Sequence, residues 1–194
     1  MKHKIITISR QFGSGGRTIG KAVAEKLGIP CYDQQLITML AEESGFSKEY
    51  VQESGETATR SSWLSSLMSD RVYDTPITED LLWEAQRKMI LDLADKGPCV
   101  IVGRCADFIL KDRDDCLKAY IHADKALRAK RIVEIYGERE DSPEKRIADK
   151  DKARAAFYKQ YTKHIWGEAE NYHIALDSGE LGLETCAKLL VDLY

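Results

Sequence analysis

A glycine-rich turn between an expected strand and an expected helix constrains this chain more than any other segment. The β-branched run at residues 5–8 is typical of a buried strand, and Ile19, Val23 and Leu27 recur at helical spacing. The connecting residues 9–18 read Ser-Arg-Gln-Phe-Gly-Ser-Gly-Gly-Arg-Thr. A strand that runs through glycines into a helix aims backbone N–H groups and the positive end of the helix dipole at one point. The segment therefore predicts an anion site, of the kind that most often binds phosphate.

The kind of phosphate site depends on the register of the glycines. If Gly16 is the last glycine before the helix, residues 11–18 align with the pattern G-x-x-x-x-G-K-[ST]. In that register Gln11 replaces the first glycine, Arg17 replaces the lysine, and Thr18 supplies the hydroxyl. Two of the four fixed positions are then substituted.

Two other motifs compete for the same glycines. The stretch 15–21 matches the first part of the pattern literally, but it ends in Ala22 and would lie inside the expected helix, so we reject it. A dinucleotide-binding G-x-G-x-x-G begins at Gly13, has Thr18 for its third glycine, and has Asp33 where a ribose-binding acid would lie. A tight turn without a ligand is the remaining alternative, although a run of glycine and serine this long exceeds what such a turn requires.

Composition limits the class of protein. A length of 194 residues suits one α/β domain spanning 1–194. The net charge of -3 excludes an overall basic footprint for nucleic acid. The apolar run near the N-terminus is too short for a signal peptide, and no apolar stretch approaches the ~20 residues of a membrane helix. The 5 cysteines form no C-x-x-C pair, so we expect a cytoplasmic protein without nucleic acid or membrane partners.

Strand-like runs alternate with helical segments along the chain. After the first strand they lie at residues 30–32, 99–102, 117–121 and 173–176. This alternation predicts a five-stranded parallel sheet with helices on both faces and a ligand site at the carboxyl ends of the strands. Residues 34–97 are more than one crossover helix needs, so we expect a helical insertion there, with a hinge or loop at the serine-rich stretch 61–66.

Several arginines are placed near the expected ligand edge of the sheet. Arg104 follows the third strand, where a guanidinium can fork onto a phosphate. Arg128 and Arg131 lie one turn apart on a helix that Asp124 is placed to cap and that ends near Gly137. For that pair, spacing alone favours a solvated helix face.

A second long helix begins at Ser142-Pro143 and runs toward Gly167. One of its faces carries Asp151, Arg154, Tyr158 and Tyr161. A core face would not hold an acid and an arginine without partners. The face therefore points to a ligand, and the alternative is an Asp151–Arg154 pair on a solvated helix. The charged stretch 138–141 between the two helices is loop-like and placed to close over a ligand.

These residues together resemble the cytidylate kinase-like family of P-loop nucleoside monophosphate kinases. The resemblance covers nearly the whole chain and is most specific at residues 6–17 and 100–104, with further matches at 128–131, 151–154 and 171–172. It implies a three-layer P-loop NTPase fold. In such a fold the helical insertion 34–97 lies on the acceptor side and the helices of 124–165 form a lid.

The resemblance also implies cofactors, an acceptor and roles for individual residues. The cofactors would be ATP and Mg²⁺, and the acceptor a small nucleotide, which we expect to be a pyrimidine nucleoside monophosphate such as CMP. The catalytic arginines would be Arg17, Arg104, Arg131 and Arg154. The ATP-binding loop would comprise Gly13, Ser14, Gly15, Gly16, Arg17 and Thr18, with Thr18 also holding Mg²⁺. We assign to the acceptor site Asp33, Arg104, Asp151, Arg154 and Tyr158.

The chain departs from the family pattern at the loop and at the third strand. Arg17 stands for the loop lysine, and a guanidinium does not replace an ammonium group freely on a migrating phosphoryl group. Val102 and Cys105 stand where the family has acids, one of which helps to read cytosine, so the base preference stays open, as does the oligomeric state. The alternatives are a nucleotide-binding regulatory module with little transfer, and an NAD-type oxidoreductase that uses Gly13, Gly15 and Asp33.

Overall fold

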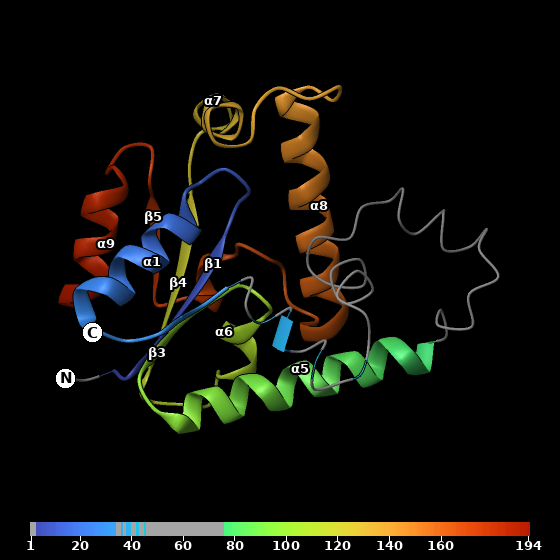
Figure 1. Ribbon diagram of the computed structural model, residues 1–194, viewed down its shortest axis with the longest axis vertical. Helices are drawn as coiled ribbons and strands as arrows, with labels where there is room; N and C mark the ends of the chain where they lie inside the picture. Colours follow the sequence, from blue (N-terminus) through green and yellow to red (C-terminus); the bar gives the residue numbers. More distant parts are fainter. Residues whose placement is uncertain (1–2, 34–35, 37, 40–41, 43–44, 46–75) are drawn as a thin grey trace.

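β1 lies at the centre of a five-stranded sheet (Figure 1). The computed structural model describes residues 3–33, 36, 38, 39, 42, 45 and 76–194. The strands run in the order β2-β3-β1-β4-β5, and all the pairs are parallel. Their bounds are β1 (Ile5–Arg10), β2 (Cys31–Tyr32), β3 (Cys99–Val102), β4 (Cys116–His122) and β5 (Ile174–Asp177). The predicted parallel sheet and the five predicted strand positions are confirmed.

Side chains of β1 alternate between two hydrophobic layers. Ile5 lies in one layer, whereas Ile6 and Ile8 lie in the other. An all-parallel sheet needs cover on both faces, and this alternation gives the three-layer architecture that the sequence predicts. The covering helices are α1 (Gly16–Leu27) and α9 (Leu183–Asp192) on one face, and α5 (Pro76–Lys96) and α6 (Ala106–Ile109) on the other (Figure 1).

Two helices, α7 (Lys125–Tyr136) and α8 (Pro143–Thr162), stand at the carboxyl end of the sheet (Figure 1). Asp124 caps α7 by accepting a hydrogen bond from the N–H of Ala126 at 2.8 Å. Ser142 caps α8, and both predicted helix starts are confirmed. α8 ends at Thr162 and does not run on to Gly167, because Lys163 adopts a left-handed conformation with φ of 64°.

Only part of the predicted insertion 34–97 is described. Its last third is α5, whose residues Leu82, Met89, Ile90 and Leu93 pack into the core below the sheet. Residues 46–75, including the expected hinge at 61–66, lie outside the described residues. None of the helices in the described ranges is long and apolar enough to cross a membrane. A short 3-10 helix, η1 (Ala169–Asn171), precedes β5.

Candidate phosphate-binding site

The glycine-rich loop, residues 11–15, joins the carboxyl end of β1 to the start of α1. Gly13 and Gly15 have positive φ angles of 80° and 83°, which glycine adopts without steric cost. The N–H of Ile19 donates to the carbonyl oxygen of Gly15 at 2.9 Å. Gly15 is therefore the N-cap, and Gly16 is the first residue of α1. The helix begins one residue earlier than the predicted register requires.

This start corrects the alignment of the loop with the phosphate-binding pattern. The predicted register, with Gly16 before the helix and Arg17 in the lysine position, is wrong. With Gly15 as the glycine before the helix, Arg10 takes the first position, Gly16 the lysine position and Arg17 the hydroxyl position. The reason is steric, because a Cβ atom on Gly16 would lie 2.5 Å from the Cβ atom of Arg10. Only glycine lets the helix begin this close to the end of β1.

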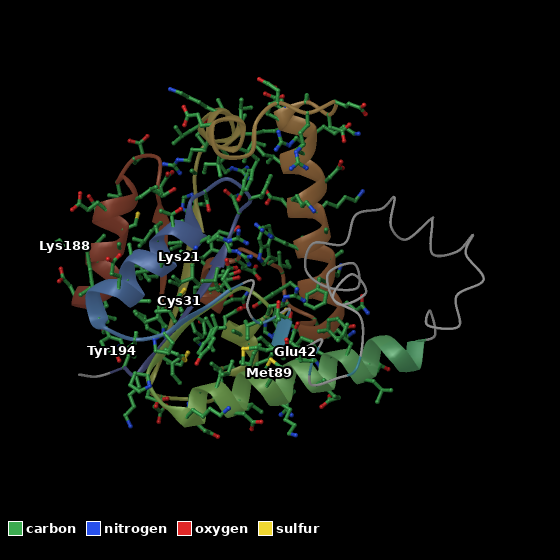
Figure 2. The ribbon with its side chains drawn as sticks, viewed as in Figure 1. Lys21, Cys31, Glu42, Met89, Lys188 and Tyr194 are labelled. Atoms are coloured by element: carbon green, nitrogen blue, oxygen red, sulfur yellow. The ribbon has the colours of Figure 1, made fainter. Side chains whose placement is uncertain are left out.

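The literal match at residues 15–21 falls inside α1, as predicted from its context. Lys21 lies in the second turn of the helix and is exposed (Figure 2). A lysine in that position is too far along the helix to belong to the loop, so the rejection of this match is confirmed.

Several backbone N–H groups of the loop have no acceptor in the described part of the protein. Within the described part of the chain, no group accepts a hydrogen bond from the N–H of Gly13, Gly15, Gly16 or Arg17. No side chain caps the start of α1. A left-handed glycine followed by right-handed residues forms a concave set of donors, and the helix dipole adds positive potential there. The donor set fits a phosphate group.

Two arginines of α7 hold the loop. Nη1 of Arg131 donates to the carbonyl oxygen of Ser14 at 3.1 Å and to Oγ of Ser178 at 3.0 Å. Nε of Arg128 donates to the carbonyl oxygen of Ala123 at 3.1 Å, and its Nη1 donates to that of Phe12 at 3.2 Å. Arg128 is only 7% exposed, so the solvated face favoured by spacing is wrong for this residue.

Side chains of α8 reach the same loop from the other side. Oδ1 of Asp151 accepts a hydrogen bond from the N–H of Phe12 at 2.7 Å, and its Oδ2 accepts one from Nη1 of Arg128 at 2.6 Å. Arg154 is buried and donates through Nη1 to the carbonyl oxygen of Arg10 at 2.9 Å. Asp151 therefore pairs with an arginine of α7, and because Arg154 is buried and the Asp151 side chain is only 18% exposed, the alternative of a solvated helix face is wrong.

Tyr158, on the same helix, is buried deeper in the protein. Its hydroxyl donates to Oδ2 of Asp107 at 2.7 Å. Burial and the neighbouring charge of Asp107 raise the pKa of Tyr158 well above its usual range, so the hydroxyl stays protonated and remains a donor. In this structure the phenol is engaged with α6.

Arg104 lies in a strained turn after β3. Gly103, Arg104 and Cys105 have consecutive positive φ angles of 77°, 61° and 54°. A left-handed residue other than glycine costs about 1 to 3 kcal/mol and persists where the surroundings enforce it. Gln86 of α5 holds Arg104 in this conformation. Nε2 of Gln86 donates to the carbonyl oxygen of Arg104 at 3.1 Å, and Nη1 of Arg104 donates to Oε1 of Gln86 at 3.3 Å. The guanidinium is thereby fixed at the carboxyl edge of the sheet.

Arg17 and Asp33 form an ion pair between Nε and Oδ2 at the helix end of the loop. Burial, with the nearby charge of Asp33, raises the pKa of the adjoining Cys31 thiol to about 11. Asp33 is thus bound to Arg17, although the dinucleotide alternative assigns it to a ribose. Thr18 is exposed and lines a hollow between α1 and α9 together with Leu183.

The predicted site residues fall into three groups. Arg131, Asp151 and Arg154 contact the loop, Arg17 pairs with Asp33 beside it, and Arg104 and Tyr158 lie at the end of β3 and against α6. Sequence reasoning missed three residues: Arg128 as a loop contact, Gln86 and Ser178. Ser178 directly follows β5, so its position at the carboxyl edge carried a signal, whereas the contact of Gln86 with Arg104 depends on how α5 packs.

The order of the strands separates this fold from the dinucleotide-binding one. The order 3-2-1-4-5-6 is typical of dinucleotide folds. Here β3 lies between β2 and β1, and the glycine-rich loop follows the central strand. Sheet order and loop together define a three-layer α/β protein of the P-loop class.

The chain belongs to the cytidylate kinase-like family, whose sequence profile matches residues 5–180. It is 27% identical over 148 residues to a cytidylate kinase from Pyrococcus horikoshii. That alignment covers 76% of this chain and 65% of the relative, so the chain spans slightly under two thirds of the length of this relative.

Solved structures share the fold. An uncharacterized protein from Eubacterium ventriosum superposes with a TM-score of 0.74 at 26% identity, covering 97% of this chain and 96% of its own. A shikimate kinase from Acinetobacter baumannii, solved in complex with shikimate, superposes with a TM-score of 0.56 at 15% identity, covering 98% of this chain and 92% of its own. At that identity the second likeness supports the fold alone.

Proposed function

We propose that this protein transfers the γ-phosphoryl group of ATP to a pyrimidine nucleoside monophosphate such as CMP. The observation that carries the proposal is a set of loop N–H groups without an acceptor among the described residues, next to arginines fixed by α7, α8 and the end of β3. These N–H groups belong to Gly13, Gly15, Gly16 and Arg17. Membership of the cytidylate kinase-like family supports the same reaction class.

Donor phosphates would bind at the loop amides and Arg131. Nη1 of Arg131 lies 3.6 Å from the position that a Cβ atom on Gly15 would take, so its charge is at the rim of the loop. Planar guanidinium groups suit phosphate oxygens, and fixed donors stabilise the charge that spreads over a transferring phosphoryl group. ATP would supply the phosphoryl group and Mg²⁺ would neutralise its charge. Thr18 lies one residue after the hydroxyl position of the corrected register, and as the hydroxyl in the first turn of α1 it is our proposed metal contact. Arg17, which is paired with Asp33, would reach the phosphates only by leaving that carboxylate.

The acceptor would bind between the end of β3 and α8. Arg104 and Arg154 are both buried, and their hydrogen bonds to Gln86 and to the Arg10 carbonyl keep the two positive charges in place. Buried cations at this edge favour an acceptor that itself carries a phosphate. We place Asp33 and Tyr158 on this side as well. Closure of the lid, residues 124–165, would exclude water and limit hydrolysis of ATP.

A nucleotide-binding regulatory module is the second candidate, and one observation favours it. The lysine position of the loop holds Gly16, and Arg17 is engaged with Asp33. A module of this kind would bind ATP at the loop amides without accelerating transfer.

A screen of acceptors distinguishes the two candidates. The purified protein is mixed with ATP, Mg²⁺ and one of CMP, UMP, AMP, GMP or shikimate, and ADP formation is followed. We expect ADP to appear with a pyrimidine monophosphate and not with shikimate. ATP binding without acceptor-dependent ADP would select the module, and NAD binding without ATP binding would select an oxidoreductase.

A pair of arginine variants tests the site within the same assay. Arg131→Ala removes charge-assisted hydrogen bonds at the loop, each of which contributes about 1.5 to 3 kcal/mol, so kcat/KM should fall at least roughly 10-fold. Arg87→Ala, at an exposed position on α5, is the matched control and should keep the parent rate. Equal activity of the two variants would remove Arg131 from the site.

A further inference from the structure

Phe12, the loop residue before Gly13, is held through both of its backbone polar groups. Its N–H donates to Oδ1 of Asp151 at 2.7 Å, and its carbonyl oxygen accepts from Nη1 of Arg128 at 3.2 Å. Asp151 and Arg128 close the arrangement with an ion pair of 2.6 Å, and their side chains are 18% and 8% exposed. One residue of α7 and one of α8 thus form a clamp on a single loop residue, through the two peptide groups that flank it.

The side chain of Phe12 is fixed as well. Its ring stacks on Tyr136 with the ring centroids 5.9 Å apart, and the guanidinium of Arg154 lies 5.8 Å from the centroid of the Phe12 ring. The next residue has no room for a side chain, because a Cβ atom on Gly13 would lie 2.9 Å from the carbonyl oxygen of Arg128, so the backbone of the loop packs directly on α7. The conformation in which the loop presents its N–H groups therefore depends on the contact between the loop and the two helices.

We propose that Asp151 is a positioning residue for the phosphate loop, acting with Arg128 through the backbone of Phe12. The ion pair is largely removed from water, so taking Asp151 away leaves a buried charge on Arg128 and an unsatisfied N–H on Phe12. The turn at Gly13 then loses its anchor, and the N–H groups of the loop that lack an acceptor in the described part of the chain no longer point at one position. The resemblance to nucleotide kinases implies instead that Asp151 contacts the acceptor sugar. This inference rests on the proposed function in one respect, which is that ATP is the ligand of the loop.

Hydrogen exchange and ATP titration test this role without turnover. In Asp151→Ala we expect the amide of Phe12 to exchange at least roughly 10-fold faster and ATP affinity to fall by about the same factor, the effect of losing one charge-assisted hydrogen bond. Arg128→Ala should do the same, and the double variant should add little to either single change. Asp149→Ala, at an exposed acid on the same helix, is the matched control and should leave both quantities unchanged. Unchanged exchange at Phe12 in Asp151→Ala would overturn the proposal.

A conservative variant separates positioning from general damage to the fold. Asp151→Asn keeps an oxygen for the Phe12 N–H but loses the ion pair, so exchange at Phe12 should stay close to the parent rate while ATP affinity lies between those of the parent and Asp151→Ala. If Asp151→Asn behaves like Asp151→Ala in both measurements, the hydrogen bond to Phe12 is not what positions the loop.

A comparison of acceptors separates positioning from contact with the sugar. The ratio of kcat/KM for CMP to that for 2′-deoxy-CMP should be the same in the parent and in Asp151→Ala if Asp151 acts only through the loop. A ratio that falls toward unity in the variant would show that Asp151 binds the sugar hydroxyl, and would overturn the proposal. If the parent binds ATP but transfers nothing, the proposed function fails, while the exchange and titration results still decide the role of Asp151.

Discussion

Replacing Gly15 by alanine perturbs the loop at a position where the structure gives a magnitude. At φ of 83° an L-residue costs about 1 to 2 kcal/mol. The added Cβ atom would also overlap Cδ2 of Leu183, which is the end of a flexible, half-buried side chain that can move aside, so the packing cost is at the low end of overpacking, about 1 kcal/mol. Gly15→Ala should therefore lower the free energy of unfolding by roughly 2 to 3 kcal/mol, and it should weaken ATP binding because the N–H groups shift.

Gly28 provides the matched control at the other end of the same helix. It is also left-handed, with φ of 66°, but a Cβ atom there would meet nothing within 4 Å. Gly28→Ala should lower the free energy of unfolding only by the cost of a left-handed backbone, about 1 to 2 kcal/mol, and should leave ATP binding unchanged. Urea denaturation measures both costs, and a Leu183→Ala background should bring the cost of Gly15→Ala toward that of Gly28→Ala. Equal costs in the parent background would refute the close packing of α9 on the loop.

Three further changes test individual residues. Thr18→Ala should weaken nucleotide binding only when Mg²⁺ is present, and equal affinity with and without the metal in both proteins would remove Thr18 as a metal contact. Arg17→Ala should lower the rate of phosphoryl transfer by a larger factor than it lowers the affinity for ATP. If the variant transfers at the rate of the parent protein, Arg17 has no role in transfer and serves only to pair with Asp33. Burial raises the pKa of Tyr120 from 10.0 to about 12, so the unfolded chain ionises first and stability falls as the pH rises through this interval. Denaturation at about pH 9 and about pH 11 should show a smaller fall in Tyr120→Phe than in the parent.

Much of the fold could be predicted because the local sequence of most strands and helix starts favours the structure that they adopt. Buried parallel strands need β-branched runs, and the run at 99–102 shows this pattern without reference to the rest of the chain. Asp124 and Ser142 act within one helical turn, so both helix starts could be read from the sequence. The end of α8 could not, because a left-handed Lys163 has no compositional signal.

The sequence predicted which residues belong to the candidate site better than it predicted which of them contact one another. A run of glycines does not say which one caps the helix, and here the packing of Arg10 against Gly16 decides it. Helical spacing placed Arg128 and Asp151 on faces of different helices, but only the packing of α7 against α8 brings them together. Contacts between distant elements decide which polar groups are buried, and no local pattern encodes them.

Transfer of an isotopic label tests the central claim most directly. ATP labelled in its γ-phosphate is incubated with the protein, Mg²⁺ and excess CMP, and the products are separated. We expect the label to appear in the nucleoside diphosphate, and we expect Gly15→Ala to slow its appearance while Gly28→Ala does not. A label that stays in ATP, or that is released only as inorganic phosphate, would contradict the claim that the glycine-rich loop serves phosphoryl transfer between nucleotides.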